Sequence, residues 1–225
     1  MVLGAPQRRR DVGGALKQHL TVWRIEPDAA QHLRASLGET EEGEVAEQAF
    51  IKWAASAYTE WCRVHEDREE VTIRRDTGAS AEWLRGKRLL LLGCGALGSF
   101  IGEYLVRAGA ATVDLVDKDV VTPGILVRQL HNDDYIAYSK SHSLKKRLES
   151  IKFPTVIRPH INNLRYGVFK HFDPDAFDLV IDATASQTVA CILEEELKTL
   201  DQAPPIASAS VSKEAQYGMA IVRMS

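Results

Sequence analysis

The sequence predicts an α/β protein: a Rossmann-like, doubly wound and mainly parallel sheet, preceded by an α-rich N-terminal extension. A run of four leucines at residues 89–92 is too short for a helix and is typical of a buried strand. A glycine-rich turn at residues 93–98 follows it and leads into helical spacing. From there onward, short apolar runs alternate with helical segments, which is the rhythm of a parallel sheet with helical crossovers.

The composition is that of an ordinary globular protein. With 225 residues, 45% of them hydrophobic and 26% charged, the chain has room for one large domain and an extension. A net charge of −3 gives no general attraction to nucleic acid or to anionic membranes. The three cysteines form no CxxC pair, and no apolar run approaches the roughly 20 residues that a membrane span needs. We therefore expect a cytoplasmic protein without a nucleic-acid or membrane partner.

The domain boundary is expected near residue 80, which leaves residues 1–80 as the extension and residues 81–225 as a nucleotide-binding domain. Residues 1–17 are rich in glycine and arginine and are expected to be poorly ordered. Residues 20–25 are a candidate strand, because they are mostly β-branched, aromatic or apolar.

Two helices are predicted in the extension. Pro27 begins the first, and Gly38 stops it. The second is expected over residues 45–61, where apolar side chains recur at three- and four-residue spacing. Its apolar stripe suits packing on the chain's own core, which we favour, or a docking or dimer interface.

The elements of the larger domain follow in a regular order. Strands are expected at residues 89–92, 113–116, 155–158, 177–182, 205–209 and 218–222, and helices from residue 100, at 140–151 and at 188–200. No helix follows the last strand, so we expect this domain to be truncated at its C-terminal end.

The glycine turn is the first candidate binding element. Gly93, Gly95 and Gly98 allow backbone N–H groups and the N-terminus of the following helix to approach a phosphate or a ribose. A side chain at Gly95 would obstruct that approach. Asp117 ends the next strand about 20 residues later, where a ribose-binding carboxylate is expected. These features predict a mononucleotide site, and binders of nicotinamide and of adenine nucleotides share them.

Three charged residues further along favour a triphosphate. Asp119 adds a second carboxylate at the strand end, and Arg128 and Lys140 follow in the next loop and at the next helix start. Such cations neutralise phosphate charge while a carboxylate helps to hold Mg²⁺. A hydride-transfer enzyme does not need this set. The alternative is that Arg128 forms a surface salt bridge and Lys140 only starts a helix.

The combined motifs resemble the ThiF/MoeB/HesA family, which shares its adenylation domain with ubiquitin-activating enzymes. The family pattern is GxGxLG, a strand ending in Asp-x-Asp, Asn-Leu-x-Arg-Gln, a lysine, and a strand ending in Asp-x-Thr-Asp-Asn. The matching residues here are 93–98, 117–119, 125–129, Lys140 and 182–186, and residues 205–209 resemble the family's next strand. The resemblance covers residues 85–224.

The resemblance implies a site for ATP and Mg²⁺. Residues that would bind the nucleotide are Gly93, Gly95, Ala96, Leu97, Gly98, Asp117, Asp119, Arg128, Gln129 and Lys140. Among these, Asp117 would hold the ribose hydroxyls and Asp119 would lie near the metal and phosphates. Arg128 and Lys140 would be the catalytic residues, because they would stabilise the pentavalent phosphorus.

The implied reaction is adenylation of a protein carboxylate. In the family, the C-terminal carboxylate of a ubiquitin-like or sulfur-carrier protein attacks the α-phosphate of ATP, and pyrophosphate leaves. Members act as homodimers, with an arginine of one subunit reaching the other site. This chain lacks the usual arginine-rich motif, and Arg74, Arg75 or Arg85 would have to replace it.

Two positions depart from the family pattern. Ile125 replaces the asparagine before Leu-x-Arg, and Ala185 replaces the magnesium-binding aspartate, with Ser186 after it instead of asparagine. Losing a metal carboxylate removes charge stabilisation from the site. The chain is therefore expected to be a divergent activating enzyme, or else a catalytically weak nucleotide-binding adaptor or dimerisation module. An NAD-dependent oxidoreductase is the less favoured third reading.

No thioester nucleophile or zinc site is predicted, because the family's cysteines for these roles lie beyond the matched region. Cys94 in the glycine turn, Cys191 in a helix interior and Cys62 are expected to be packing residues. His131 is expected at the surface, with a place near the phosphates as the alternative.

Overall fold

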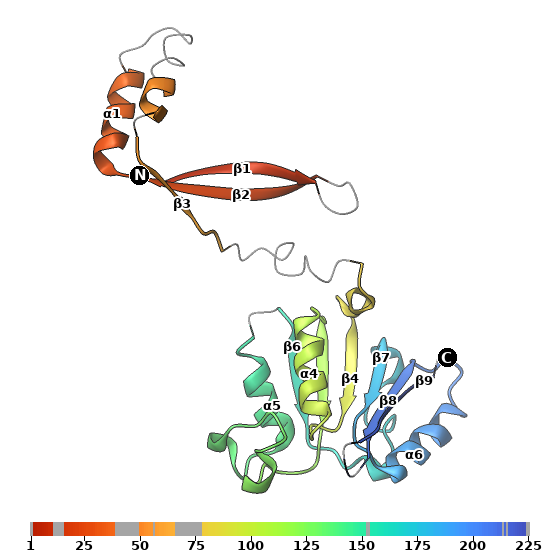
Figure 1. Cartoon of the computed structure of the whole chain (residues 1–225). Coiled ribbons are helices and arrows are strands. Elements are labelled where there is room, and N and C mark those ends of the chain that lie inside the picture. Colours follow the sequence, from red (N-terminus) through yellow and green to blue (C-terminus); the bar gives the residue numbers. More distant parts are fainter. Residues whose placement is uncertain are drawn as a thin grey trace. The chain divides into compact units, whose positions relative to one another are not determined.

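The computed structural model divides the chain into two compact units, Met1–Thr72 and Ile73–Ser225 (Figure 1). It describes residues 2–10, 16–38, 50–55, 57–65, 78–151, 154–212, 214 and 216–223. Within these residues no helix is long and apolar enough to cross a membrane. The two units are described separately.

The first unit is built on a three-stranded antiparallel sheet. Its strands are β1 (Val2–Arg10), β2 (Leu16–Ile25) and β3 (Thr59–Cys62), in the order β1-β2-β3. Helix α1 (Pro27–Gly38) follows β2, and a short helical segment spans residues 50–55. Trp53 connects this segment to α1, because its indole Nε1 donates a 2.7 Å hydrogen bond to the Ala29 carbonyl.

Two expectations for this unit were wrong, and its α-rich character stays a prediction. Among the described residues more lie in strands than in helices, but residues 39–49 and 66–72 of this unit lie outside them. Residues 2–10 form β1 where poor order was expected, since the hydrogen-bonding partner is β2, a long-range pairing that local composition does not reveal. The helix predicted over 45–61 is seen at 50–55 but does not extend to residue 61, because Trp61 lies in β3 opposite Trp23 of β2. Residues 45–49 of that prediction lie outside the described residues.

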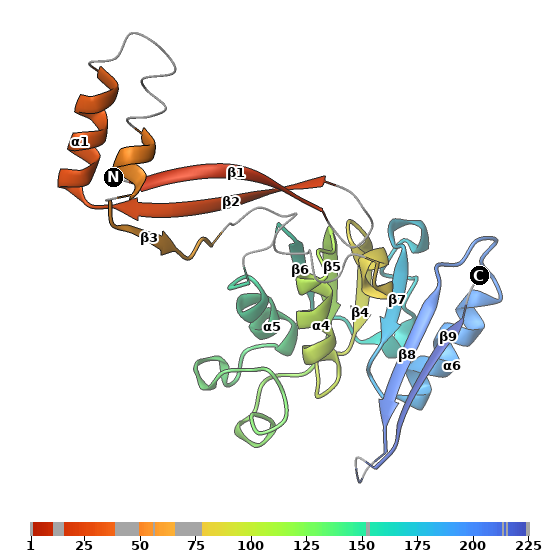
Figure 2. The same cartoon turned by 45° about the horizontal axis from the view of Figure 1, so that its top comes forward.

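The second unit contains a six-stranded sheet in the order β6-β5-β4-β7-β8-β9 (Figure 2). Its neighbouring strands pair parallel except β8 and β9, which pair antiparallel. The strands are β4 (Arg88–Leu92), β5 (Thr112–Val116), β6 (Val156–His160), β7 (Leu179–Asp182), β8 (Ile206–Val211) and β9 (Gly218–Arg223). The helices are α4 (Gly98–Arg107), α5 (Lys140–Leu148) and α6 (Gln187–Leu197). Short 3-10 turns span Ser80–Leu84, Pro123–Ile125, Asp133–Tyr135, Leu164–Tyr166 and Pro174–Ala176. This architecture confirms the predicted Rossmann-like fold.

The leucine run is buried because β4 is covered on both faces (Figure 2). Leu89 and Leu91 pack with residues of α4 and α5, whereas Leu90 and Leu92 pack with residues of α6. Alternate side chains of a strand point to opposite faces, so a strand between two helical layers is apolar throughout.

The strand order places a crevice at the end of β4. The chain first adds β5 and β6 on one side of β4, then returns to add β7 and β8 on the other. At such a reversal the loops that leave the carboxyl ends of neighbouring strands diverge, and ligands of open α/β sheets bind there. Because β4, β5, β6 and β7 are parallel, the loops that follow them all lie at this edge of the sheet.

Candidate nucleotide-binding site

The glycine turn after β4 has two glycines that the fold itself requires. Gly93 has a φ of +89°, and a Cβ there would lie 3.0 Å from the Ala183 carbonyl oxygen at the end of β7. A Cβ on Gly98 would lie 1.8 Å from the carbonyl oxygen of Gly93. A side chain at Gly98 would clash with backbone, and one at Gly93 would be strained by both the positive φ and the close backbone contact.

Gly95 differs from its two neighbours. A Cβ there would have only Gln129 Nε2 nearby, at 4.0 Å, and its φ is not in the left-handed region. The fold therefore tolerates a side chain at Gly95. Its absence leaves open space beside the turn and exposes the backbone to a ligand, as the sequence predicts.

A pocket of about 250 Å³ lies at this edge of the sheet. Its lining residues come from the ends of β4, β5, β6 and β7 and from the starts of α5 and α6. They are Gly93, Gly95, Val116, Asp117, Lys118, Asp119, Lys140, Asn162, Asn163, Leu164, Arg165, Ala183, Thr184, Ser186, Thr188 and Val189. Of the predicted site residues, the pocket brings together Gly93, Gly95, Asp117, Asp119 and Lys140.

Asp117 is fixed in orientation by backbone donors. Its Oδ2 accepts a 2.8 Å hydrogen bond from the N–H of Cys94, and its Oδ1 accepts one of 2.8 Å from the N–H of Asp119. Each carboxylate oxygen has two lone-pair sites, so both oxygens can accept a further hydrogen bond. A rigid carboxylate at the pocket wall suits the two hydroxyl groups of a ribose.

Lys140 begins α5 and lies against Asp119. Its Nζ lies 3.6 Å from Asp119 Oδ2, while Lys118 Nζ lies 3.4 Å from Asp119 Oδ1. Only 12% of the Lys140 side chain is exposed, against 54% for Asp119. An ion pair with so exposed a partner contributes little to the stability of the fold. The main consequence of the arrangement is that Lys140 places a positive charge at the pocket wall.

The pocket offers limited support for a metal. No cluster of three or more metal-ligating side chains occurs in the part of the chain that the structure describes. Asp182, at the end of β7, is buried, and its Oδ1 already accepts from the N–H and the hydroxyl of Thr184. Asp119 remains as the exposed carboxylate, and Mg²⁺ is commonly held by one carboxylate together with nucleotide phosphates and waters. The donor set fits Mg²⁺ only as part of a nucleotide complex.

Other predicted residues lie outside the pocket lining. Arg128 is exposed in the loop after the Pro123–Ile125 turn, and Ala96 is exposed in the glycine turn. Leu97 packs against the core, and Gly98 is the first residue of α4. Gln129 lies beside Gly95, and its Oε1 is buried without a hydrogen-bond partner among the described residues.

His131 is buried, so its expected surface position is wrong. The residue is only 6% exposed, with Nε2 3.0 Å from the Cys94 carbonyl oxygen and Nδ1 3.0 Å from Ser143 Oγ. Burial is the main cause that lowers the pKa of His131. Its partners lie 37 and 12 residues away in sequence, so no local pattern reveals them.

The loop after β6 was also missed as part of the site. Asn162, Asn163 and Arg165 line the pocket, although none of them is among the site residues predicted from the sequence. The available signal was its position after a predicted strand, since parallel strands end at a common edge.

The cysteines divide between buried and exposed positions. Cys94 is fully buried as expected, and burial raises the pKa of its thiol well above the usual value, which disfavours a nucleophilic thiolate. Cys191 is exposed, so its predicted packing role is wrong: α6 turns Val189 and Leu193 toward the sheet and Cys191 toward solvent. Cys62 belongs to β3 and is partly exposed.

Of the three arginines that could reach across a dimer, the structure describes one, Arg85. Arg74 and Arg75 lie outside the described residues. Arg85 lies before β4, and its Nε is buried without a hydrogen-bond partner among the described residues.

The sequence is similar to those of several proteins named as adenylyltransferases. It is 31% identical over 145 residues to the molybdopterin-synthase adenylyltransferase of Haemophilus influenzae, covering 61% of this chain and 56% of that protein. It is 35% identical over 120 residues to the adenylyltransferase and sulfurtransferase UBA4 of Candida glabrata, covering 50% of this chain and 26% of that protein. The chain thus spans little more than half of the first of these relatives and about a quarter of the second.

Solved structures share the fold at lower identity. The E. coli tRNA N6-threonylcarbamoyladenosine dehydratase TcdA in complex with ATP has a TM-score of 0.51 and 22% identity, covering 65% of this chain and 61% of that one. E. coli MccB with AMPCPP and MccA has a TM-score of 0.55 and 14% identity, covering 80% of this chain and 55% of that one.

The family model described as "ThiF family" matches residues 71–219, about two thirds of the chain. This stretch includes every strand and helix that contributes to the pocket. The chain therefore belongs to the ThiF family.

Proposed function

We propose that the second unit binds ATP and transfers its adenylyl group to the C-terminal carboxylate of a ubiquitin-like or sulfur-carrier protein. The observation that carries this proposal is the pocket in which Asp117, Lys140 and the unobstructed backbone at Gly95 face the same space. The relatives named as adenylyltransferases support it. So do similar folds that hold ATP and AMP.

The proposed domain boundary stays near residue 80, with residues 81–225 forming the adenylation domain. The family model begins at residue 71, and the second compact unit begins at Ile73. We further propose a homodimer, as the resemblance implies. Light scattering at several protein concentrations tests this, and a monomer at all of them contradicts it.

The nucleotide is oriented by groups at opposite sides of the glycine turn. The Asp117 carboxylate accepts hydrogen bonds from the ribose hydroxyls, because its two oxygens are already aligned by backbone N–H groups. The phosphates then pass the backbone at Gly95 and approach Lys140, whose charge they neutralise. Arg128 lies in the loop beyond this wall, and its long, exposed side chain is proposed to turn toward the same phosphates.

Adenylation then needs orientation and charge stabilisation more than acid–base chemistry. An oxygen of the incoming carboxylate forms a bond to the α-phosphorus while the bond from that phosphorus to the pyrophosphate oxygen breaks. The carboxylate is already ionised and nucleophilic, so no proton has to be removed. Lys140 and Arg128 stabilise the negative charge that builds on the phosphate oxygens in the transition state. Such electrostatic stabilisation is usually the largest single contribution to the rate of a phosphoryl-transfer reaction.

Mg²⁺, when bound with the nucleotide, would neutralise phosphate charge and would be held by Asp119. Because Lys118 and Lys140 flank that carboxylate, it is oriented by two cations before any nucleotide enters. Ala185 supplies no ligand at the position where the family has its magnesium-binding aspartate.

Exchange of radiolabelled pyrophosphate into ATP tests this function. Purified ubiquitin-like and sulfur-carrier proteins are supplied one at a time, and exchange is measured for the wild type and for Asp117→Ala. Exchange that requires a carrier and is lost in Asp117→Ala supports adenylation. Preference for NADH over ATP in a competition experiment contradicts the proposal, because it assigns the pocket to a dinucleotide.

A further inference from the structure

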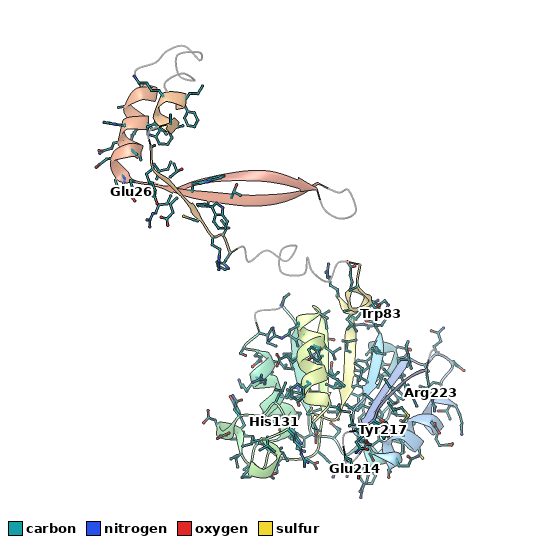
Figure 3. All side chains as sticks on the ribbon, in the orientation of Figure 1. Glu26, Trp83, His131, Glu214, Tyr217 and Arg223 are labelled. Atoms are coloured by element: carbon teal, nitrogen blue, oxygen red, sulfur yellow. The ribbon has the colours of Figure 1, made fainter. Side chains whose placement is uncertain are left out.

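A buried histidine connects three parts of the proposed site. The carbonyl oxygen of Cys94 can only accept a hydrogen bond, so Nε2 of His131, 3.0 Å away, must carry a proton. In the neutral ring Nδ1 is then an acceptor, and the hydroxyl of Ser143, also 3.0 Å away, donates to it. Figure 3 labels His131 in the loop that follows β5, beside α5.

The first connection holds the glycine turn. The peptide groups of Cys94 are engaged from two directions: its N–H donates to Asp117 Oδ2 at 2.8 Å, and its carbonyl accepts from His131. Asp117 therefore fixes the turn relative to β5, and His131 fixes it relative to the following loop.

The second connection holds the helix that carries Lys140. Ser143 is three residues after Lys140 on α5, so the two side chains leave the same face of the helix. Ser143 is 1% exposed, and its bond to His131 restrains the rotation of α5 about its own axis. That rotation decides the direction in which Lys140 leaves the helix.

The third connection holds the loop that contains Arg128 and Gln129. Directly after them, the N–H of Leu130 donates to Ser99 Oγ at 3.2 Å, and His131 bonds to Cys94. Ser99 is fully buried at the start of α4. The loop is thus attached to α4 one residue beyond Gln129, through Leu130, and to the glycine turn two residues beyond it, through His131.

We propose that His131 is a positioning residue that sets the phosphate-binding groups of the site relative to one another. It does not line the pocket, and it acts through Cys94, Ser143 and its own loop. The inference rests on the proposed nucleotide site and deepens it. Asp117 retains its bond to the Asp119 N–H without the histidine, so the ribose contact is expected to survive its loss.

Calorimetric titration with ATP and with AMP, both with Mg²⁺, separates positioning from general damage. His131→Phe keeps a buried ring and removes both hydrogen bonds, so we expect the Kd for ATP to rise about tenfold and the Kd for AMP to change by less than about twofold. His131→Gln retains an N–H donor for Cys94 and should recover most of the ATP affinity. His171→Gln, an exposed histidine outside the pocket lining, is the matched control and should bind as wild type.

Equal weakening of ATP and AMP binding, or unchanged ATP binding, in His131→Phe overturns the proposal. If that variant does not fold, Ser143→Ala removes the α5 connection alone and should show the same selective loss of ATP affinity.

Hydrogen exchange of the ligand-free protein distinguishes failure of this inference from failure of the proposed function. If the wild type binds no ATP, the proposed function fails, and the positioning role is still decided by exchange. Faster exchange at residues 93–98 and 140–144 in His131→Phe, with an unchanged unfolding midpoint, supports the role. Unchanged exchange in both segments refutes it.

Discussion

Substitution of Gly95 should change ATP affinity without lowering the stability of the fold. The nearest atom to an added Cβ is Gln129 Nε2 at 4.0 Å, and the backbone is not in the left-handed region. Gly95→Ala should therefore leave the free energy of unfolding unchanged or raise it by up to about 1 kcal/mol, because alanine reduces the freedom of the unfolded chain. The methyl group would nevertheless occupy the space through which the phosphates pass, and ATP affinity should fall at least about tenfold, or about 1.4 kcal/mol.

Gly98→Ala is the matched control for this prediction. Its Cβ would lie 1.8 Å from the Gly93 carbonyl oxygen, so the turn must shift and the free energy of unfolding should fall by about 1–3 kcal/mol or more. Urea denaturation gives the stability of both variants, and calorimetry gives their ATP affinity. A Gly95→Ala protein that binds ATP as well as wild type would contradict the passage of the phosphates beside Gly95. One that is as unstable as Gly98→Ala would contradict the tolerance of the fold for a side chain there.

Three further predictions follow from the site. Lys140→Met should lower the pyrophosphate exchange rate about 100-fold with little change in stability, since the lysine's pair with half-exposed Asp119 contributes little to folding; exchange within twofold of wild type contradicts this. Ala185→Asp should lower the Mg²⁺ concentration needed for half-maximal exchange, and the protein should tolerate it, because residue 185 is exposed at a φ of +53° that suits aspartate better than alanine; an unchanged requirement argues against a metal role there. The folded-state pKa of His131 is lowered by burial and by Lys140 and Arg147, against the opposing effects of the Cys94 carbonyl and Asp117. Its neutral form is thus favoured in the fold, and the stability this gives is complete above the unfolded pKa near 6.5 and is lost as pH falls through the folded pKa. His131→Phe should remove this part of the pH dependence of unfolding, and an identical pH profile would contradict the assignment.

The central sheet was predictable because its signals are local. The leucine run is short, apolar and followed by glycines, and each later strand is a brief apolar segment between turn residues. The positions of Asp117 and Lys140 followed from these elements, since residues after parallel strands meet at one edge.

The remaining features depend on contacts between distant residues. Nothing near residue 2 indicates β1, because its stabilising partner is β2, and Trp61 joins β3 because β2 offers an open edge opposite it. Most of the residues near His131 in the sequence are polar, as in a surface loop. Its burial depends instead on Cys94 and Ser143, which are distant in sequence and form both of its hydrogen bonds. The different roles of Gly93 and Gly95 also depend on the fold, because sequence spacing does not show which glycine lies beside Ala183.

The most direct test of the account is detection of the acyl adenylate itself. The chain, ATP and Mg²⁺ are incubated with single ubiquitin-like or sulfur-carrier proteins, and the intact mass of each carrier is measured after rapid quenching. We expect the mass of one carrier to increase by a single adenylyl group, and this increase to disappear with Lys140→Met or when the carrier's C-terminal carboxylate is amidated. ATP binding with no adenylylated carrier, or adenylylation that persists on the amidated carrier, would contradict it.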